Sequence, residues 1–438
     1  MERRSYFKDI LSVFGSNLSV TVSNLLLGII LSRVLGAAGF GLYSFLIVVP
    51  VIVIGFTQLG IRRSTIYHIG QKNINEDNLA SALIVLWLWT SFLSIIICGL
   101  VYFFSATQPY DPLNVVLILL TIPLLLMNLF AGGIFLGKQE ILRSNIINAG
   151  PTLLTLILTV VFVWVLKLSV LGAFIAVFLA NFIMFFYVYY TIIMEYRYKI
   201  TWKYHEPLMK SMIKLGLVNA LAIFVMQLNY RIDVLMLKKL SSLEQVGFYS
   251  VATQIAEQIW YIPYAIETII LSRSANATND HAVTRTVASI FRVSMITGIL
   301  ASVLIFFIAP YVIPWIFGKE FMNSVPMIQT ILPGILILVA FRILNSHLTG
   351  MGKPQVAIYT FLPALIINFV ANLFLIPKYG GMGAVWSTNI SYAIGSIAFI
   401  LVYSKLIKMP VREILTLRKS DFYFYRDIRV RKKQNSPE

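Results

Sequence analysis

Long apolar runs separated by short polar breaks are the feature that most constrains this chain. Twelve runs are each long enough to cross the roughly 30 Å of bilayer hydrocarbon as a helix of about 20 residues. No break exceeds about 20 residues, which leaves no room for a soluble catalytic domain. Only 12% of residues are charged, about half the usual share in soluble proteins. The sequence predicts an all-α polytopic membrane protein with helices at roughly 10–35, 41–62, 80–104, 113–136, 146–166, 170–194, 211–237, 246–271, 287–308, 326–349, 356–376 and 383–404.

Lysine and arginine predict the orientation. If the N-terminus is cytoplasmic, 27 of the 35 basic residues lie inside, 6 lie outside, and Arg231 and Arg342 fall within spans. Basic residues concentrate in cytoplasmic loops, so the chain is predicted to be a multi-pass protein of the cytoplasmic membrane with both termini inside. The same asymmetry explains most of the net charge of +17, and no nucleic-acid partner is expected.

Short motifs recur in the same order along the chain. Gly-x-Tyr-Ser occurs at 41–44 and again at 247–250, Gly-Lys occurs at 137 and 352, and Gly-Ala occurs at 172 and 383. Both copies begin on the same side of the membrane under the predicted topology. We therefore predict two pseudo-symmetric six-helix bundles, at 1–210 and 211–409, followed by a basic cytoplasmic tail at 410–438. Transporters commonly bind their substrates between such repeats.

Two segments resemble a known family. Ser32-Arg-Val-Leu-Gly36 with Gly39-Phe-Gly-Leu-Tyr-Ser44 is similar to the first-loop signature of polysaccharide transporters, and Arg231-Ile-Asp-Val-Leu-Met-Leu237 with Gly247-Phe-Tyr-Ser250 is similar to their seventh-span signature. These are the Wzx-type flippases of the multidrug/oligosaccharidyl-lipid/polysaccharide exporter superfamily. The resemblance implies a V-shaped cavity, alternating access, and export of lipid-linked oligosaccharide repeat units.

Ionisable residues inside spans usually face a cavity or a partner, because they are costly in hydrocarbon. Arg231 and Asp233 lie about 200° apart on one helix, so one should face the cavity and the other a neighbouring helix. Arg342 could bind a lipid phosphate through its two-pronged guanidinium, with Asn345 on the same face. The alternatives are a structural clamp for Arg231 and snorkelling to lipid headgroups for Arg342.

Two polar stripes, one with a single carboxylate and one without charge, complete the set of candidates. Gln254, Glu257 and Gln258 share a helix face, where Glu257 could bind a coupling cation or accept a proton. The alternative is an interhelical hydrogen-bond seam. Asn24 lies on a polar stripe of the first run that could bind sugar hydroxyls or merely pack helices, and Arg33 follows at its outer end.

The sequence therefore predicts a flippase without catalytic residues, metal or cofactor, coupled to H⁺ or Na⁺. The predicted substrate-binding residues are Arg231, Arg342, Asn24, Gln254, Gln258, Asn345 and Arg33, and the predicted ion-coupling residues are Glu257 and Asp233. A multidrug exporter is the first alternative. A membrane-embedded polymerase or transferase is the second, although no clustered acids, phosphate loop or nucleophile–base motif is found. Expected partners are lipid-linked oligosaccharide, anionic lipids beneath the basic tail, and polysaccharide assembly enzymes.

Overall fold

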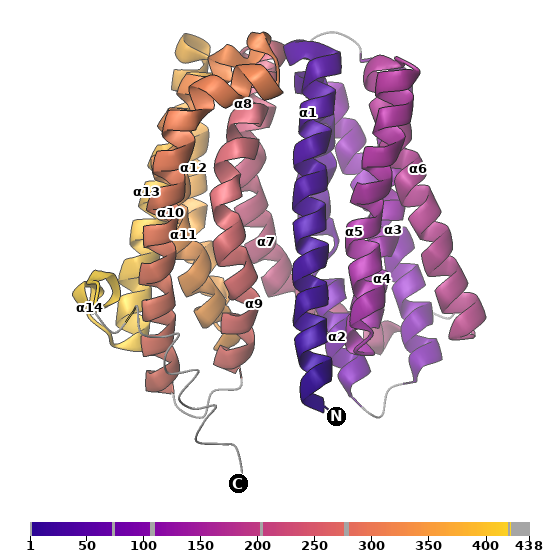
Figure 1. Ribbon diagram of the computed structural model, residues 1–438. Coiled ribbons are helices and arrows are strands. Elements are labelled where there is room, and N and C mark those ends of the chain that lie inside the picture. Colours follow the sequence, from indigo (N-terminus) through magenta and orange to yellow (C-terminus); the bar gives the residue numbers. More distant parts are fainter. Residues whose placement is uncertain are drawn as a thin grey trace. The chain divides into compact units, whose positions relative to one another are not determined.

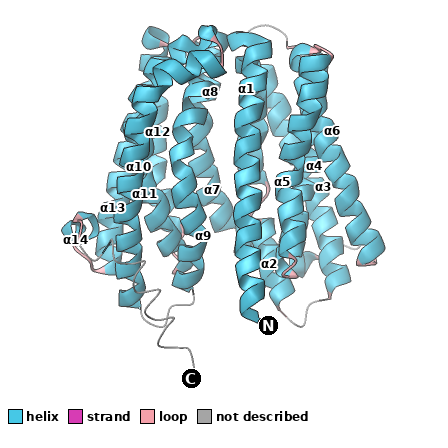
Figure 2. Ribbon diagram, in the orientation of Figure 1, coloured by secondary structure: helices cyan, strands magenta, loops and turns pink. Residues whose placement is uncertain are grey.

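The computed structural model is built of helices (Figures 1 and 2). It describes residues 2–71, 75–105, 110–201, 205–275, 280–418 and 421. The helices are α1 (Glu2–Thr57), α2 (Ile61–Gly70), α3 (Glu76–Ser105), α4 (Pro112–Gly137), α5 (Ile141–Thr159), η1 (Val160–Val165), α6 (Ser169–Tyr190), η2 (Thr191–Glu195), α7 (Glu206–Leu240), α8 (Leu243–Ala256), η3 (Glu257–Trp260), α9 (Tyr261–Ala275), α10 (Asp280–Ile316), η4 (Lys319–Asn323), α11 (Ser324–Gly350), α12 (Gln355–Tyr379), α13 (Gly381–Ile407) and α14 (Val411–Leu415).

The first two predicted spans form one kinked helix. Gly36 interrupts α1 with φ 68° and ψ −178°, a backbone conformation that glycine adopts at little cost. The interruption frees the N–H of Ala37 from the helical ladder, and Glu320 Oε1 accepts it at 2.9 Å. The kink therefore divides α1 into two segments and gives the freed donor a carboxylate partner.

The eighth predicted span is also interrupted. Residues 246–271 are divided among α8, the 3₁₀ turn η3 and α9. Ten described helices are individually long and apolar enough to cross a membrane. That number counts α1 once and leaves out the broken α8–α9 run, so each of the twelve predicted spans corresponds to helix. The predicted all-α polytopic fold is confirmed.

Gly41 and Gly247 allow two helices to meet at backbone distance. A Cβ added to Gly41 would lie 1.9 Å from the carbonyl oxygen of Leu243, and one added to Gly247 would lie 2.1 Å from that of Ala37. Any side chain would therefore clash with backbone. These are the glycines of the repeated Gly-x-Tyr-Ser motif, so the two motif copies pack against each other.

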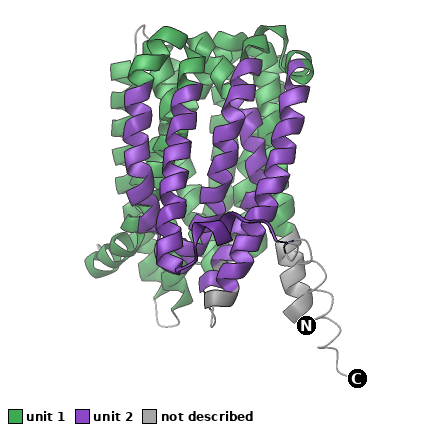
Figure 3. Cartoon of the chain, turned by 90° about the vertical axis from the view of Figure 1, so that its left-hand side faces the viewer, with its two compact units in different colours: residues 1–251, 311–324, 372–384 green, residues 252–310, 325–371, 385–438 purple. Residues whose placement is uncertain are grey.

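Two compact units divide the chain (Figure 3). Unit 1 contains residues 1–251, 311–324 and 372–384, and unit 2 contains residues 252–310, 325–371 and 385–438. Unit 1 includes segments from both predicted halves of the chain. The division into 1–210, 211–409 and 410–438 therefore stays a prediction.

A proline inside a span of unit 2 shows how a missing helical hydrogen bond can be accommodated. Pro333 lies within α11 and cannot donate a helical hydrogen bond. One residue later, Asn389 of α13 accepts the N–H of Gly334 at 3.2 Å and donates to the carbonyl of Thr330 at 2.6 Å. A side-chain amide thus bridges a donor and an acceptor that are four residues apart in α11.

Candidate functional site

Asp233 lies at the centre of a polar cluster in unit 1. Its side chain is completely buried. The Tyr249 hydroxyl donates to Oδ2 at 2.8 Å, and Asn372 Nδ2 donates to Oδ1 at 2.5 Å. Both donors are uncharged, and they come from α8 and α12. The predicted coupling residue is thus brought together with a tyrosine of the next helix and with an asparagine that lies 139 positions away in the sequence.

Arg33 binds the end of a helix in the structure. Its Nε donates to the carbonyl of Ile316 at 2.6 Å, and its Nη2 donates to the carbonyl of Trp315. These are the last carbonyls of α10, which have no partner within their own helix. A cation at a helix C-terminus is also favoured by the helix dipole. Arg33 therefore joins α1 to the end of α10.

The other predicted residues of unit 1 lie on two helices. Asn24 is exposed on α1, and Arg231 is half-buried on α7, two residues before the completely buried Asp233. Each has polar interactions with the protein. The unequal burial of Arg231 and Asp233 agrees with their predicted placement on different helix faces.

Arg342 belongs to an aromatic and acidic cluster in unit 2. Its Nε lies 2.7 Å from Glu267 Oε1, and its Nη2 lies 3.4 Å from Oε2. The guanidinium carbon lies 5.2 Å from the ring centre of Trp260 and 5.9 Å from that of Tyr264, within cation–π range. The indole of Trp260 in turn donates to the carbonyl of Ile335 at 3.0 Å, so the cluster lies close to Pro333 of α11.

The polar face predicted at 254–258 meets the 3₁₀ turn. Glu257 is half-buried and begins η3. Gln258 Nε2 donates to the carbonyl of Gln254 at 2.7 Å. In α11, the buried Oδ1 atom of Asn345 accepts no hydrogen bond from the described residues. Unit 2 thus contains one predicted coupling residue and four predicted substrate residues.

The beginning of the predicted tail is anchored to unit 2. Asp421 accepts from Arg292 Nε and Nη2, both at 2.6 Å, and both side chains are buried. Arg292 Nη1 also donates to the carbonyls of Glu413 and Ile414. Burial alone would raise the pKa of Asp421, but hydrogen bonds from Arg292 and the Arg418 N–H lower that pKa to about 2. Residues 419, 420 and 422–438, with most of the predicted lipid-binding charge, lie outside the described residues.

Histidine, cysteine and carboxylate side chains do not form a metal-binding group of three or more among the residues that the structure describes. Cys98, the single cysteine of the chain, is buried and is not part of a disulfide.

A family model described as polysaccharide biosynthesis protein matches residues 6–262, more than half of the chain. The chain belongs to this family. A second model, MatE, matches residues 219–374 of this polysaccharide biosynthesis family member. An uncharacterized membrane protein of Methanocaldococcus jannaschii is 24% identical over 181 residues, which are 40% of this chain and 36% of that protein. The match thus spans about a third of that relative's length.

Solved transporter structures share the fold of this polysaccharide biosynthesis family member. An inward-facing multidrug resistance MATE transporter of the MOP superfamily has a TM-score of 0.75 at 14% identity, over 89% of this chain and 94% of that one. The lipid II flippase MurJ, in an inward closed conformation, has a TM-score of 0.74 at 13% identity, over 99% and 94%. A MOP superfamily transporter from Pyrococcus furiosus has a TM-score of 0.64 at 16% identity, over 93% and 95%. The twelve-helix, pseudo-symmetric architecture is therefore confirmed, and so is the predicted superfamily fold.

Sequence reasoning missed the partners of the charged residues. Tyr249 lay in a recognised motif, but nothing in its spacing linked it to Asp233. Glu267 follows Glu257 by ten residues in the same predicted span. A carboxylate inside an apolar run is a signal that could have identified it as a candidate partner for Arg342. Asn372 and Asp421 are distant from their partners in sequence and required the fold.

Proposed function

We propose that this protein is a flippase that moves lipid-linked oligosaccharide across the cytoplasmic membrane by alternating access. The observation that carries the proposal is the match of residues 6–262 to the polysaccharide biosynthesis family. The fold shared with a lipid II flippase supports it, because that protein is named for a lipid-linked substrate. A secondary transporter of this kind needs no catalytic residues.

Arg231 and Arg342 are proposed to bind the substrate phosphate. A phosphate entering a low-dielectric region without a partner would suffer a large desolvation penalty. The Arg342 side chain is 15% exposed and that of Glu267 is 21% exposed, so the pair is partly accessible. Glu267 compensates the arginine in the absence of substrate. A phosphate would compete with Glu267 for the guanidinium, and Trp260 and Tyr264 would keep the arginine in place.

Ion coupling is proposed to involve Asp233 and Glu257. A fully buried carboxylate is costly to ionise unless its charge is compensated. The hydroxyl of Tyr249 and the amide of Asn372 hold the carboxylate of Asp233 in place through hydrogen bonds. Binding of H⁺ or Na⁺ at this carboxylate would change the charge of the buried cluster. Glu257, which is half-buried, would provide a second carboxylate, in unit 2.

A multidrug exporter is the second candidate function. The MatE match at 219–374 and the MATE structure favour it. The two candidates differ in the sign of the cargo, because cationic drugs need carboxylates, whereas a lipid phosphate needs arginine. The cluster of Arg342 with Glu267 offers both signs, so the cargo must be tested directly.

Ligand-dependent thermal stabilisation separates these two functions. The purified protein is heated with a lipid-linked oligosaccharide or with a cationic dye such as ethidium. We expect stabilisation by the lipid-linked sugar, a weaker effect in R342K, which loses the two-pronged geometry, and none in R342A. The control R273A removes an exposed arginine of α9 and should behave as the wild type. Stabilisation by ethidium alone would favour the exporter.

The proposed location is the cytoplasmic membrane, with both termini inside. Enzymes that assemble polysaccharide would supply the substrate and use the product. Anionic lipids are proposed to bind the basic residues of the tail at 410–438.

A further inference from the structure

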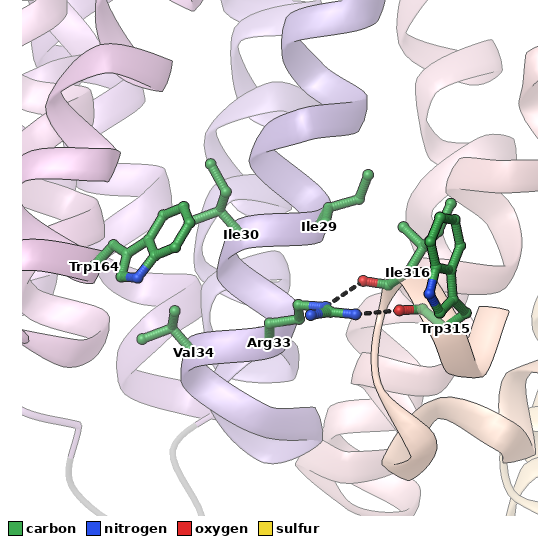
Figure 4. A pocket seen from close by; sticks show the side chains of 7 residues that line it. All are labelled: Ile29, Ile30, Arg33, Val34, Trp164, Trp315 and Ile316. Atoms are coloured by element: carbon green, nitrogen blue, oxygen red, sulfur yellow. Dashed lines mark hydrogen bonds between the residues drawn. The ribbon is translucent and has the colours of Figure 1, made fainter. Parts of the chain in front are cut away.

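A pocket of about 440 Å³ lies in unit 1, beside the kink of α1. Figure 4 shows Trp164 and Trp315 on opposite sides of Arg33. The residues that line the pocket come from α1, η1 and the end of α10, and they are Ile29, Ile30, Arg33, Val34, Trp164, Trp315 and Ile316.

The pocket combines apolar walls with one positive charge. Apart from Arg33, every lining residue is aliphatic or a tryptophan. The Nε and Nη2 groups of Arg33 are held by the carbonyls of Ile316 and Trp315. Within the described part of the chain, its Nη1 group donates to no acceptor. The arginine is thus fixed in position and keeps donors available for an anion.

The two tryptophans indicate where the pocket lies in the bilayer. Trp164 is 60% exposed and Trp315 is 74% exposed. They lie at the ends of the candidate spans Ile141–Val165 and Val283–Ile316. Tryptophan is enriched at this depth because its ring is amphipathic and lies at the level of the headgroups. The pocket therefore opens where lipid phosphates and the first chain carbons meet.

We propose that this pocket binds a membrane glycerophospholipid, with its phosphodiester on Arg33 and an acyl chain along Ile29 and Ile30. One guanidinium matches the single negative charge of a phosphodiester. A pyrophosphate would bring more negative charge than the lining compensates. The lining offers no hydroxyl, amide or carboxylate for a sugar, which argues against the oligosaccharide as occupant.

A lipid bound here would pack against the contact between α1 and the end of α10 in unit 1. Arg33 already joins α1 to the end of α10, and three residues later Gly36 kinks α1. The lipid would fill the space beside this joint and contact all three elements that line it. The inference does not rest on the proposed flippase activity, because it concerns a resident lipid rather than the cargo.

Native mass spectrometry and thermal unfolding of delipidated protein test the site, with dioctanoyl phosphatidylglycerol as the probe. We expect one saturable lipid and a rise in unfolding temperature. R33A should weaken binding about tenfold or more, as expected for loss of a charge-assisted hydrogen bond. Because R33A also loses two carbonyl contacts, I30W provides a second variant that fills the pocket and keeps Arg33.

The control W89A removes a tryptophan that is exposed elsewhere on α3 and should bind lipid as the wild type does. Unchanged binding in I30W and R33A would overturn the proposal. Displacement of the phospholipid by a lipid-linked oligosaccharide at lower concentration would also overturn it, by assigning the pocket to the transport path. Weaker lipid binding in both R33A and I30W, with wild-type binding in W89A, is the expected outcome.

Discussion

Gly41 and Gly247 make reciprocal contacts. Gly41 packs on the carbonyl of Leu243, and Gly247 packs on the carbonyl of Ala37. Each glycine follows the other's contact residue by four positions, so the two contacts have the same spacing. Reciprocal contact is what a two-fold relationship between repeats requires, here between the two copies of one motif within a single chain.

Alanine at either glycine should destabilise the protein. The added methyl group of G41A or G247A would meet a backbone carbonyl, which cannot rotate away, and the expected cost is about 1–3 kcal/mol. Thermal unfolding in detergent measures it. G99A is the matched control, because no atom lies within 4 Å of its added Cβ; it should be neutral or slightly stabilising. Equal stability of all three variants would contradict the close packing.

Neutralising Asp233 should impair coupling more than folding. D233N keeps the shape and removes the charge that H⁺ or Na⁺ would compensate, so transport should lose its dependence on pH or Na⁺. E257Q is expected to act in the same direction. Y249F removes one hydrogen bond to Asp233 and should shift that dependence without abolishing it. Transport by D233N and E257Q with wild-type dependence on pH and Na⁺ would make both carboxylates structural.

The C-terminal anchor should be sensitive to acid. Because the pKa of Asp421 is lowered to about 2 from 3.8 in the folded protein, its stabilisation is present above about pH 4. It should be lost as the pH falls through about 2, and it amounts to about 2 kcal/mol.

At neutral pH, D421N leaves Arg292 buried without its carboxylate. Removing one partner of a buried pair costs about 3–5 kcal/mol, which lowers the unfolding temperature. E244Q, at an exposed carboxylate, should have no such effect. If D421N unfolds at the wild-type temperature, the Arg292–Asp421 pair does not hold the segment.

Topology can be checked by cysteine labelling. In a background that lacks Cys98, N75C should react only after the membrane is permeabilised, and D111C should react from outside. The physical reason is the excess of basic residues on the side assigned to the cytoplasm. External labelling of N75C would reverse the predicted orientation.

The helices could be predicted from sequence, because apolar length is a local property. All twelve predicted spans correspond to helix in the structure. Gly36, which interrupts α1, lies in the sequence between the first two of these spans. The 3₁₀ turn that begins at Glu257 was not predicted, since apolar runs do not reveal a local change of helix type.

The candidate sites could be predicted only as single residues. Asp233 and Arg342 could be identified because ionisable side chains inside apolar runs are rare. Their partners Asn372 and Glu267 depend on which helices pack together, and no local pattern encodes that. The role of Arg33 in substrate binding stays a prediction. Its hydrogen bonds to the helix-end carbonyls of Trp315 and Ile316 depend on the fold, and no sequence signal indicated them.

Flipping of a fluorescent lipid-linked oligosaccharide by reconstituted protein tests the proposed function most directly. Substrate that has crossed the membrane of a proteoliposome is quenched by reagent added outside. We expect wild-type protein to transfer the substrate, R342K to be slower, R342A to be slower still, and R273A to match the wild type. Transfer at the rate of protein-free liposomes, in parallel with active export of ethidium, would contradict the flippase function.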